Sequence, residues 1–245
     1  MQPQAHTEGF LRRHSFVLLF GTLLLFYVLV PIVHETHDRL HPSPPLLLEG
    51  GLFFAVIIGA VISAGKGPTR TAIALLLGLT PVVLWIVKLF VDSQLLEIAR
   101  DLSGAVFFAY AIWAILIFTL ASRRVTFNTV CASLCIYMLL GLVWALAYSV
   151  VDLLIPGAFT WTLAGRSPTP RMRVGKGDTA VLYFSFATLT TLGYGDIVPT
   201  SPICRMLATV EAITGQLYLA VLVARLVGLH IAESIDQRGS FRGDL

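Results

Sequence analysis

The nine residues from Thr188 to Asp196 read TLTTLGYGD, and they stand in a chain in which 56% of the residues are hydrophobic. Such a stretch can do chemistry with backbone oxygens rather than with reactive side chains. Glycine takes, at little steric cost, backbone conformations that other L-residues avoid. Gly193 and Gly195 therefore allow successive carbonyl oxygens of an extended segment to face one axis. Rings of such oxygens replace the water shell of a dehydrated cation.

Four copies of this segment around a fourfold axis would build the rings. The oxygens would be the Thr191 hydroxyl and the carbonyls of Thr191, Leu192, Gly193 and Tyr194.

Composition places the chain in a membrane. Only 13% of the residues are charged and the mean hydropathy is +0.82, which leaves too little polar surface to cover a water-soluble globule. The net charge of +3 is small and its basic residues are scattered between apolar segments, so nothing indicates nucleic-acid binding. An all-α membrane protein in contact with lipid is expected.

Six apolar runs are long enough to span a bilayer as helices. They are Ser15 to Val33, Leu46 to Gly65, Thr71 to Val91, Leu102 to Ser122, Val125 to Ile155 and Ile203 to Ile231. The first is interpreted as a retained helix rather than a signal peptide, because it is long and no A-x-A-like cleavage site follows.

Basic residues between the runs predict the orientation. Those expected on one side are Arg12, Arg13, Lys66, Arg70, Arg123, Arg124, Arg238 and Arg242. Short cytoplasmic connections are enriched in Lys and Arg, so both termini are predicted to be cytoplasmic. The basic region from Arg166 to Lys176 departs from this rule, because it is external in the same topology.

The connection between the last two runs is too long for a hairpin loop. It holds an apolar stretch, Thr179 to Leu189, which is too short to cross the bilayer and is directly followed by the filter-like segment. We expect a short re-entrant helix that dips into the membrane and returns as extended chain, which is tolerated only where protein or a water-filled cavity covers it.

The segment resembles the signature of the potassium-channel family, written T-x-T-T-x-G-Y-G-D. The matching residues are Thr188, Thr190, Thr191, Gly193, Tyr194, Gly195 and Asp196. The resemblance covers about Val125 to Ile231. It implies potassium ions bound at Thr191, Leu192, Gly193 and Tyr194, and a homotetramer with the pore on the shared axis.

The same resemblance suggests which residues support the filter. Tyr183 and Phe184 take the place of the paired aromatic residues that brace it, with the Tyr194 ring packed against them. Two positions depart from the family pattern. Leu192 stands where valine is commonest, and Ala187 stands where some bacterial members place a buried glutamate.

Three regions follow from the pattern: a four-helix membrane domain (1–124), a pore domain (125–231) with outer helix, pore helix, filter and inner helix, and a short cytoplasmic tail (232–245). The first region is similar to a voltage-sensor bundle without gating arginines, because Leu102 to Ser122 contains no Arg or Lys. The tail is too short for a nucleotide-binding or calcium-sensing domain, so regulation is expected through the membrane, the pore or an unidentified gating partner or ligand.

Gly215 aligns with the hinge glycine of the family's inner helix, and close packing against the pore helix is an equal alternative. Residues at helical intervals around it are expected on the pore-facing side, the last three as an apolar gate: Gln216, Leu219, Val223 and Val227.

Glu211 lies one turn before Gly215, and a carboxylate in a membrane helix is costly unless it finds a partner. One hypothesis is that it faces the back of the pore helix and stiffens the filter. The other is a protonated glutamate that donates a single structural hydrogen bond.

His34, His37 and His41 have spacings that would share a helix face, so external metal or proton sensing is one interpretation. Pro31 and Pro42 bracket them and favour the other interpretation, a solvated irregular loop.

The resemblance to potassium channels implies a potassium-selective channel in a bacterial inner membrane, and no enzyme activity, organic cofactor or charged voltage sensor is expected. Two alternatives stay open: a weakly selective cation channel, and a non-conducting membrane sensor that uses the first four helices.

Overall fold

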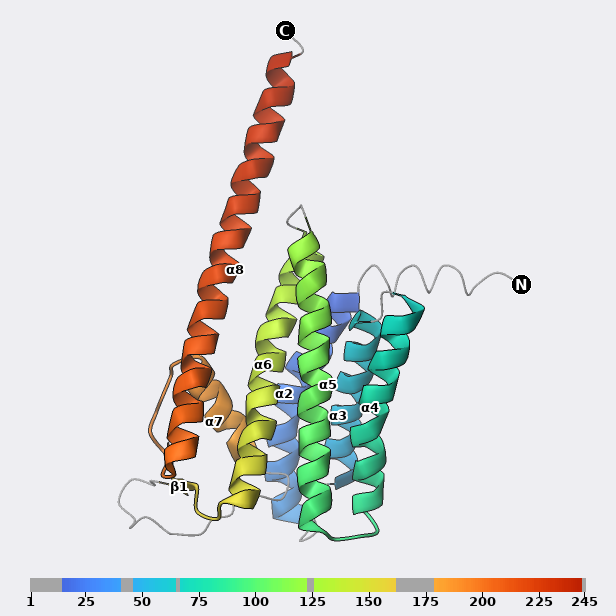
Figure 1. Cartoon of the computed structure of the whole chain (residues 1–245), viewed down its shortest axis with the longest axis vertical. Helices are drawn as coiled ribbons and strands as arrows, with labels where there is room; N and C mark the ends of the chain where they lie inside the picture. The colour runs from blue at the N-terminus through green and yellow to red at the C-terminus, as the bar shows by residue number, and fades with distance from the viewer. Residues whose placement is uncertain (1–14, 41–45, 65–66, 123–125, 162–178, 244–245) are drawn as a thin grey trace, which may run out of the picture.

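The computed structural model describes residues 15–40, 46–64, 67–122, 126–161 and 179–243. The helices and strands in chain order are α2 (Ser15–Leu40), α3 (Leu46–Ala64), α4 (Pro68–Lys88), α5 (Gln94–Ala121), α6 (Phe127–Leu154), β1 (Phe159–Trp161), α7 (Thr179–Leu189), β2 (Ile197–Pro199) and α8 (Pro202–Gly243). Helices α2 to α6 form an up-and-down bundle, α8 leans against one side of it, and α7 lies between α8 and α6 (Figure 1).

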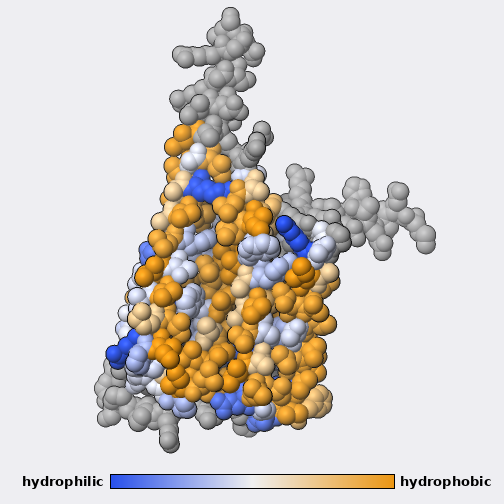
Figure 2. Space-filling view, in the orientation of Figure 1, coloured by the Kyte–Doolittle hydropathy of each residue, from blue (hydrophilic) through white to orange (hydrophobic). Residues whose placement is uncertain are grey.

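Five helices are long and apolar enough to cross a membrane, counting only the residues that the structure describes: α2, α4, α5, α6 and α8. Within α3, the shorter stretch Phe53–Ser63 is apolar. Figure 2 shows hydrophobic residues over most of the visible face, with strongly hydrophilic residues toward the helix ends. The structure therefore supports a multi-pass helical membrane protein, and six spans stay a prediction.

Local signals explain several helix ends. Pro68 occupies the first turn of α4, where its missing N–H costs nothing. Thr126 caps α6, because its hydroxyl accepts a hydrogen bond from the Thr129 N–H at 3.2 Å. Helix α5 begins at Gln94, eight residues before the predicted span, so it also contains charged residues. These charges are tolerated because they are paired, as described below.

The prediction of an irregular loop after Pro31 is wrong for residues 34–40. Helix α2 continues through Pro31 to Leu40. Proline is tolerated inside membrane helices, because neighbouring groups satisfy the backbone oxygen that it leaves free. His34 and His37 are thus on a helix, but their side chains and the whole of His41 lie outside the described residues, so the metal-binding hypothesis stays untested.

The main hydrophobic core joins the front helices to α6. Its fully buried side chains include Leu19 and Leu23 of α2, Phe107 and Phe108 of α5, and Leu139 of α6. The close packing of these large apolar side chains fixes α2, α5 and α6 relative to one another. Helix α6 thus contacts the front helices α2 and α5 as well as α7 and α8.

Two short strands were not predicted. Strands β1 and β2 pair antiparallel, with Thr160 opposite Val198. The Thr200 N–H donates to the Ala158 carbonyl at 2.8 Å, and the Thr200 hydroxyl donates to the Gly157 carbonyl at 2.6 Å. The chain that leaves the TLGYG segment is therefore fastened to the chain that leaves α6.

Candidate functional site

Helix α7 has the bounds predicted for the short apolar helix, and it packs against α6. The ring of Phe186 lies over Gly141 of α6, where a Cβ atom would collide with it. The Tyr27 ring of α2 meets Phe186 edge to face, with ring centroids 4.5 Å apart. Small size at Gly141 therefore lets α7 approach α6 closely, and the front bundle touches α7 through Tyr27.

The backbone after α7 has an unusual pattern. The φ angle is +58° at Thr191, +53° at Gly193 and +77° at Gly195, so every second residue is in the left-handed region. In a regular strand, neighbouring residues face opposite sides. Alternation in the sign of φ instead turns successive carbonyl groups toward the same side. The two glycines take the conformation expected of them.

Thr191 was not expected to have a positive φ. A β-branched residue in this region is an outlier, and its strain costs about 1–3 kcal/mol. Strain of this kind persists only where surrounding contacts fix it. Here the Thr191 N–H donates to the Thr188 carbonyl at 3.0 Å, and the Gly193 N–H donates to the Ala187 carbonyl at 3.1 Å.

The ends of the segment are also held. The Thr190 hydroxyl donates to the Phe186 carbonyl at 2.6 Å. Asp196 accepts a hydrogen bond from the Ile197 N–H at 3.0 Å, where β2 begins. The Tyr183 side chain interacts with Asp196 through a hydrogen bond. Tyr183 thus connects the middle of α7 with the residue that closes the segment.

The predicted packing of Tyr194 on Tyr183 and Phe184 is not seen within one chain. The Tyr194 ring is 71% exposed, whereas Phe184 is buried in a second core, 5.1 Å from the rings of both Tyr148 and Phe159. Phe184 faces the chain's own interior, so it supports α7 from behind. Among the residues that the structure describes, Tyr194 is therefore left largely uncovered.

Glu211 of α8 is fully buried and connects three helices. The Tyr148 hydroxyl of α6 donates to its Oε2 at 2.6 Å. Its Oε1 lies 2.6 Å from the Ser185 hydroxyl oxygen of α7. The expectation that Glu211 faces the back of the short helix therefore agrees with the structure.

Ser185 lies between Glu211 and a backbone carbonyl of α6. The Ser185 oxygen lies 2.8 Å from the Gly141 carbonyl as well as 2.6 Å from Glu211. A serine hydroxyl has one proton, and a backbone carbonyl can only accept. Either Ser185 donates to both acceptors in a three-centre bond, or it donates to Gly141 and a protonated Glu211 donates to it. The two hypotheses for Glu211 are thus compatible.

Gly215 packs directly against the end of α7. A Cβ atom there would collide with the Leu189 carbonyl oxygen, which also accepts a hydrogen bond from the Tyr137 hydroxyl at 3.2 Å. Helix α8 runs unbroken through this position. The structure thus favours the close-packing interpretation of Gly215, while the hinge stays a prediction.

The residues proposed for the pore-facing side of α8 are largely uncovered in a single chain. Val223 is 58% exposed and Val227 is 52% exposed, Gln216 is also exposed, and Leu219 is half-buried. Only 6% of the membrane-spanning window of α8 is buried, against 50% for α6. A helix that carries so much apolar surface requires lipid or another protein surface as its neighbour.

A sequence model of the family described as "Ion channel" matches residues 105–230, slightly more than half of the chain. The chain belongs to this ion-channel family. The matched region runs from within α5 through α6, α7 and the TLGYG segment into α8. Membership points to a channel rather than an enzyme.

The channel is also similar to the inward rectifier potassium channel Kirbac3.1 of Paramagnetospirillum magnetotacticum. The two are 31% identical over 90 residues, which are 35% of this chain and 24% of that relative. The similarity supports a channel of the potassium type. The chain matches only about a quarter of the relative's length, so the relative's other properties do not transfer.

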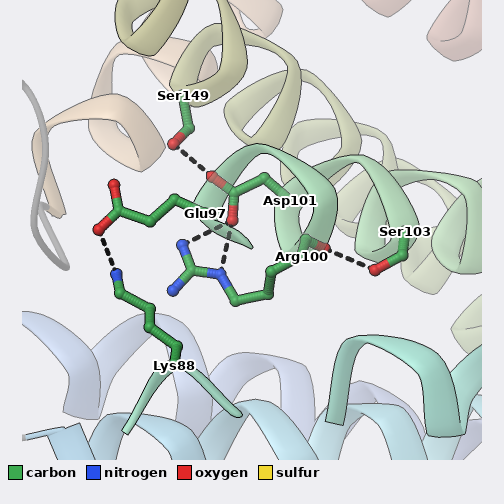
Figure 3. Close-up of polar contacts among 6 residues, drawn as sticks. All are labelled: Lys88, Glu97, Arg100, Asp101, Ser103 and Ser149. Carbon is green, nitrogen blue, oxygen red and sulfur yellow. Dashed lines mark hydrogen bonds and ion pairs between the residues drawn. The ribbon is translucent and has the colours of Figure 1, made fainter. Parts of the chain in front are cut away.

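A polar cluster joins the front helices of the channel to α6 (Figure 3). Asp101 is 2% exposed; it pairs with Arg100 at 2.6 Å and accepts a hydrogen bond from Ser149 of α6 at 2.6 Å. Lys88 at the end of α4 pairs with Glu97 of α5 at 2.5 Å. Because Asp101 has two partners, its buried charge is compensated and fixes α5 against α6.

Sequence reasoning about the channel missed Tyr148 and Ser185. A usable signal was present: a carboxyl group inside a membrane helix must find donors or acceptors, and Ser185 is a polar residue in the middle of an otherwise apolar short helix. The partner on α6 had no such signal, because tyrosine is common in membrane helices.

Proposed function

We propose that four copies of this chain form a potassium-selective channel whose filter is the TLGYG segment. The proposal rests mainly on one observation, the positive φ at Thr191, Gly193 and Gly195 directly after a short helix. Carbonyl groups turned to one side are what a filter needs in order to replace the hydration shell of a cation. The similarity to a potassium channel supports the choice of ion.

The residues have separate roles in this proposal. Potassium ions bind between rings of oxygens from Thr191, Leu192, Gly193 and Tyr194, and Gly195 completes the turn of the backbone. Support comes from Thr188, Thr190, Asp196, Tyr183, Phe184 and Glu211. The inner helix supplies Gly215, Gln216, Leu219, Val223 and Val227, of which the last three are placed at the gate.

A tetramer explains the surface that one chain leaves uncovered. Leu192, Tyr194, Val223 and Val227 are all more than half exposed in a single copy. Around a fourfold axis these residues would face the pore or a neighbouring subunit, because each subunit supplies one wall. The carboxyl end of α7 would then point its partial negative charge at the cavity below the filter.

The test is the reversal potential of the purified protein in planar bilayers under a potassium to sodium gradient. We expect reversal near the potassium equilibrium potential. Gly193→Ala places a side chain at a positive φ and should abolish the selectivity. Gly157→Ala is the matched control, because Gly157 also has a positive φ, of +81°, outside the filter.

Reversal near zero in the wild type would replace the proposal with a weakly selective cation channel. The absence of any cation flux into vesicles would contradict a channel altogether. Equal loss of selectivity in both glycine variants would mean that general unfolding, rather than the filter, is being measured.

A further inference from the structure

Arg225 of α8 reaches across to the end of α5. Its Nη2 donates to the Thr119 carbonyl and, at 3.1 Å, to the Ser122 carbonyl. The last carbonyl groups of a helix lack partners within it and carry partial negative charge. An arginine in a membrane helix is costly unless it is paired. Arg225 therefore caps α5 from a helix more than a hundred residues away in sequence.

The acceptor end of this contact belongs to a fixed frame. Helix α5 shares the main core with α6. At its other end, Asp101 binds Ser149, and the Gln94 side chain donates to the Leu153 carbonyl at 2.5 Å. Since α5 is attached to α6 along its length, a bond from α8 to the end of α5 restrains α8 rather than α5.

The position of Arg225 on α8 gives the restraint a direction. In an α-helix, two residues correspond to a rotation of about 200°. Arg225 is two residues after Val223 and two before Val227, so it projects from the side of α8 opposite to these valines and at the same level. The Tyr218 hydroxyl, two turns earlier, donates to the Ser133 carbonyl of α6 at 2.6 Å.

We infer that Arg225 is a positioning residue that holds the gate end of α8 outward against α5 and so favours the open pore. The inference rests on the proposed function, because it takes Val223 and Val227 as the gate. It explains how the front helices could act on the pore, since movement of the α5 end would be transmitted to α8 through this side chain.

The experiment combines bilayer recording with a measure of helix mobility. Arg225→Ala should lower the ratio of open to closed time tenfold or more, because four copies of a membrane hydrogen bond, each changing the equilibrium about threefold, act on one gate. Potassium selectivity should not change. Arg225→Lys, which keeps the charge and donors, should give a smaller decrease and serves if the alanine variant does not fold.

A spin label at Gly228→Cys reports on α8 without depending on conduction. Gly228 has open space around it, so a label fits. The label should become more mobile when Arg225→Ala is added. Arg70→Ala is the matched control: Arg70 is an exposed arginine on α4 that lies over the Trp113 ring, and its loss should change neither measurement.

Each outcome decides the inference. Unchanged label mobility in Arg225→Ala would show that the bond does not restrain α8. A higher open time would show that it holds the pore closed, and would overturn the stated direction. If the wild type passes no potassium, the proposed function fails while the label still reports whether the restraint exists.

Discussion

Glu211→Ala and Glu211→Gln should have very different effects, although both remove a carboxyl group. Alanine leaves the buried Tyr148 hydroxyl without its acceptor, at a cost of about 1–3 kcal/mol. It also leaves a cavity where a long buried side chain stood, and such truncations cost about 2–5 kcal/mol. The sum is about 3 kcal/mol or more per chain.

Glutamine preserves the shape and most of the hydrogen bonds. Its amide oxygen can accept from Tyr148 and its amide nitrogen can donate to Ser185, as a protonated Glu211 would. One amide N–H remains unpaired, so the loss is about 1–2 kcal/mol. Glutamine should therefore keep potassium selectivity, and alanine should weaken it, because Ser185 is on the helix that carries the filter.

Thermal unfolding of the purified protein and the reversal potential measure the two effects. For a chain of this size, about 3 kcal/mol corresponds to a fall of about 6 °C or more in the unfolding midpoint. An infrared difference spectrum between the wild type and Glu211→Gln should contain the carbonyl band of a protonated carboxylic acid. Carboxylate bands in its place, or a glutamine variant as damaged as the alanine variant, would refute the hydrogen-bond assignment.

Two further substitutions test the packing around the site. Gly215→Ala should destabilise the channel by about 1–3 kcal/mol in thermal unfolding, because its Cβ meets the Leu189 carbonyl. The control Gly228→Ala lies in open space and should be neutral or stabilising, so equal effects of the two substitutions would contradict close packing at Gly215. Asp101→Ala should lower the free energy of unfolding by about 2 kcal/mol or more in the same assay, because Arg100 and Ser149 lose the buried carboxylate that they contact. Ser103→Ala, which removes only a hydrogen bond within α5, should lower it little. A neutral Asp101→Ala variant would show that this cluster does not hold α5 to α6.

The apolar spans and the short helix α7 were predictable because their signal is local. The limits of α7, Thr179 and Leu189, were recognised because the apolar stretch ends at a run of threonine and glycine. Features that depend on contacts with other parts of the chain were not predicted. The helix through Pro31 was missed because proline usually ends a helix, and the start of α5 at Gln94 was missed because charged residues interrupt its apolar pattern.

The chemistry of the candidate site was predictable only in part. The glycine conformations at Gly193 and Gly195 follow from residue type, and their role as cation ligands stays a prediction. The positive φ of Thr191 does not follow, because a β-branched residue opposes it and only the surrounding hydrogen bonds impose it. The charge of Glu211 marked it as a residue that needs partners, but these partners could not be predicted because they belong to α6 and α7, far away in sequence.

The contacts of α8 differ between its two halves in a way that suits a gated pore. Near the proposed filter, Glu211 and Gly215 attach it to α6 and α7 through buried hydrogen bonds and close backbone packing. Toward the other end, Tyr218 and then Arg225 attach it by single side chains. Side-chain bonds to backbone carbonyls can break without disrupting a core, so motion of α8 should begin at the Arg225 end and leave the filter intact.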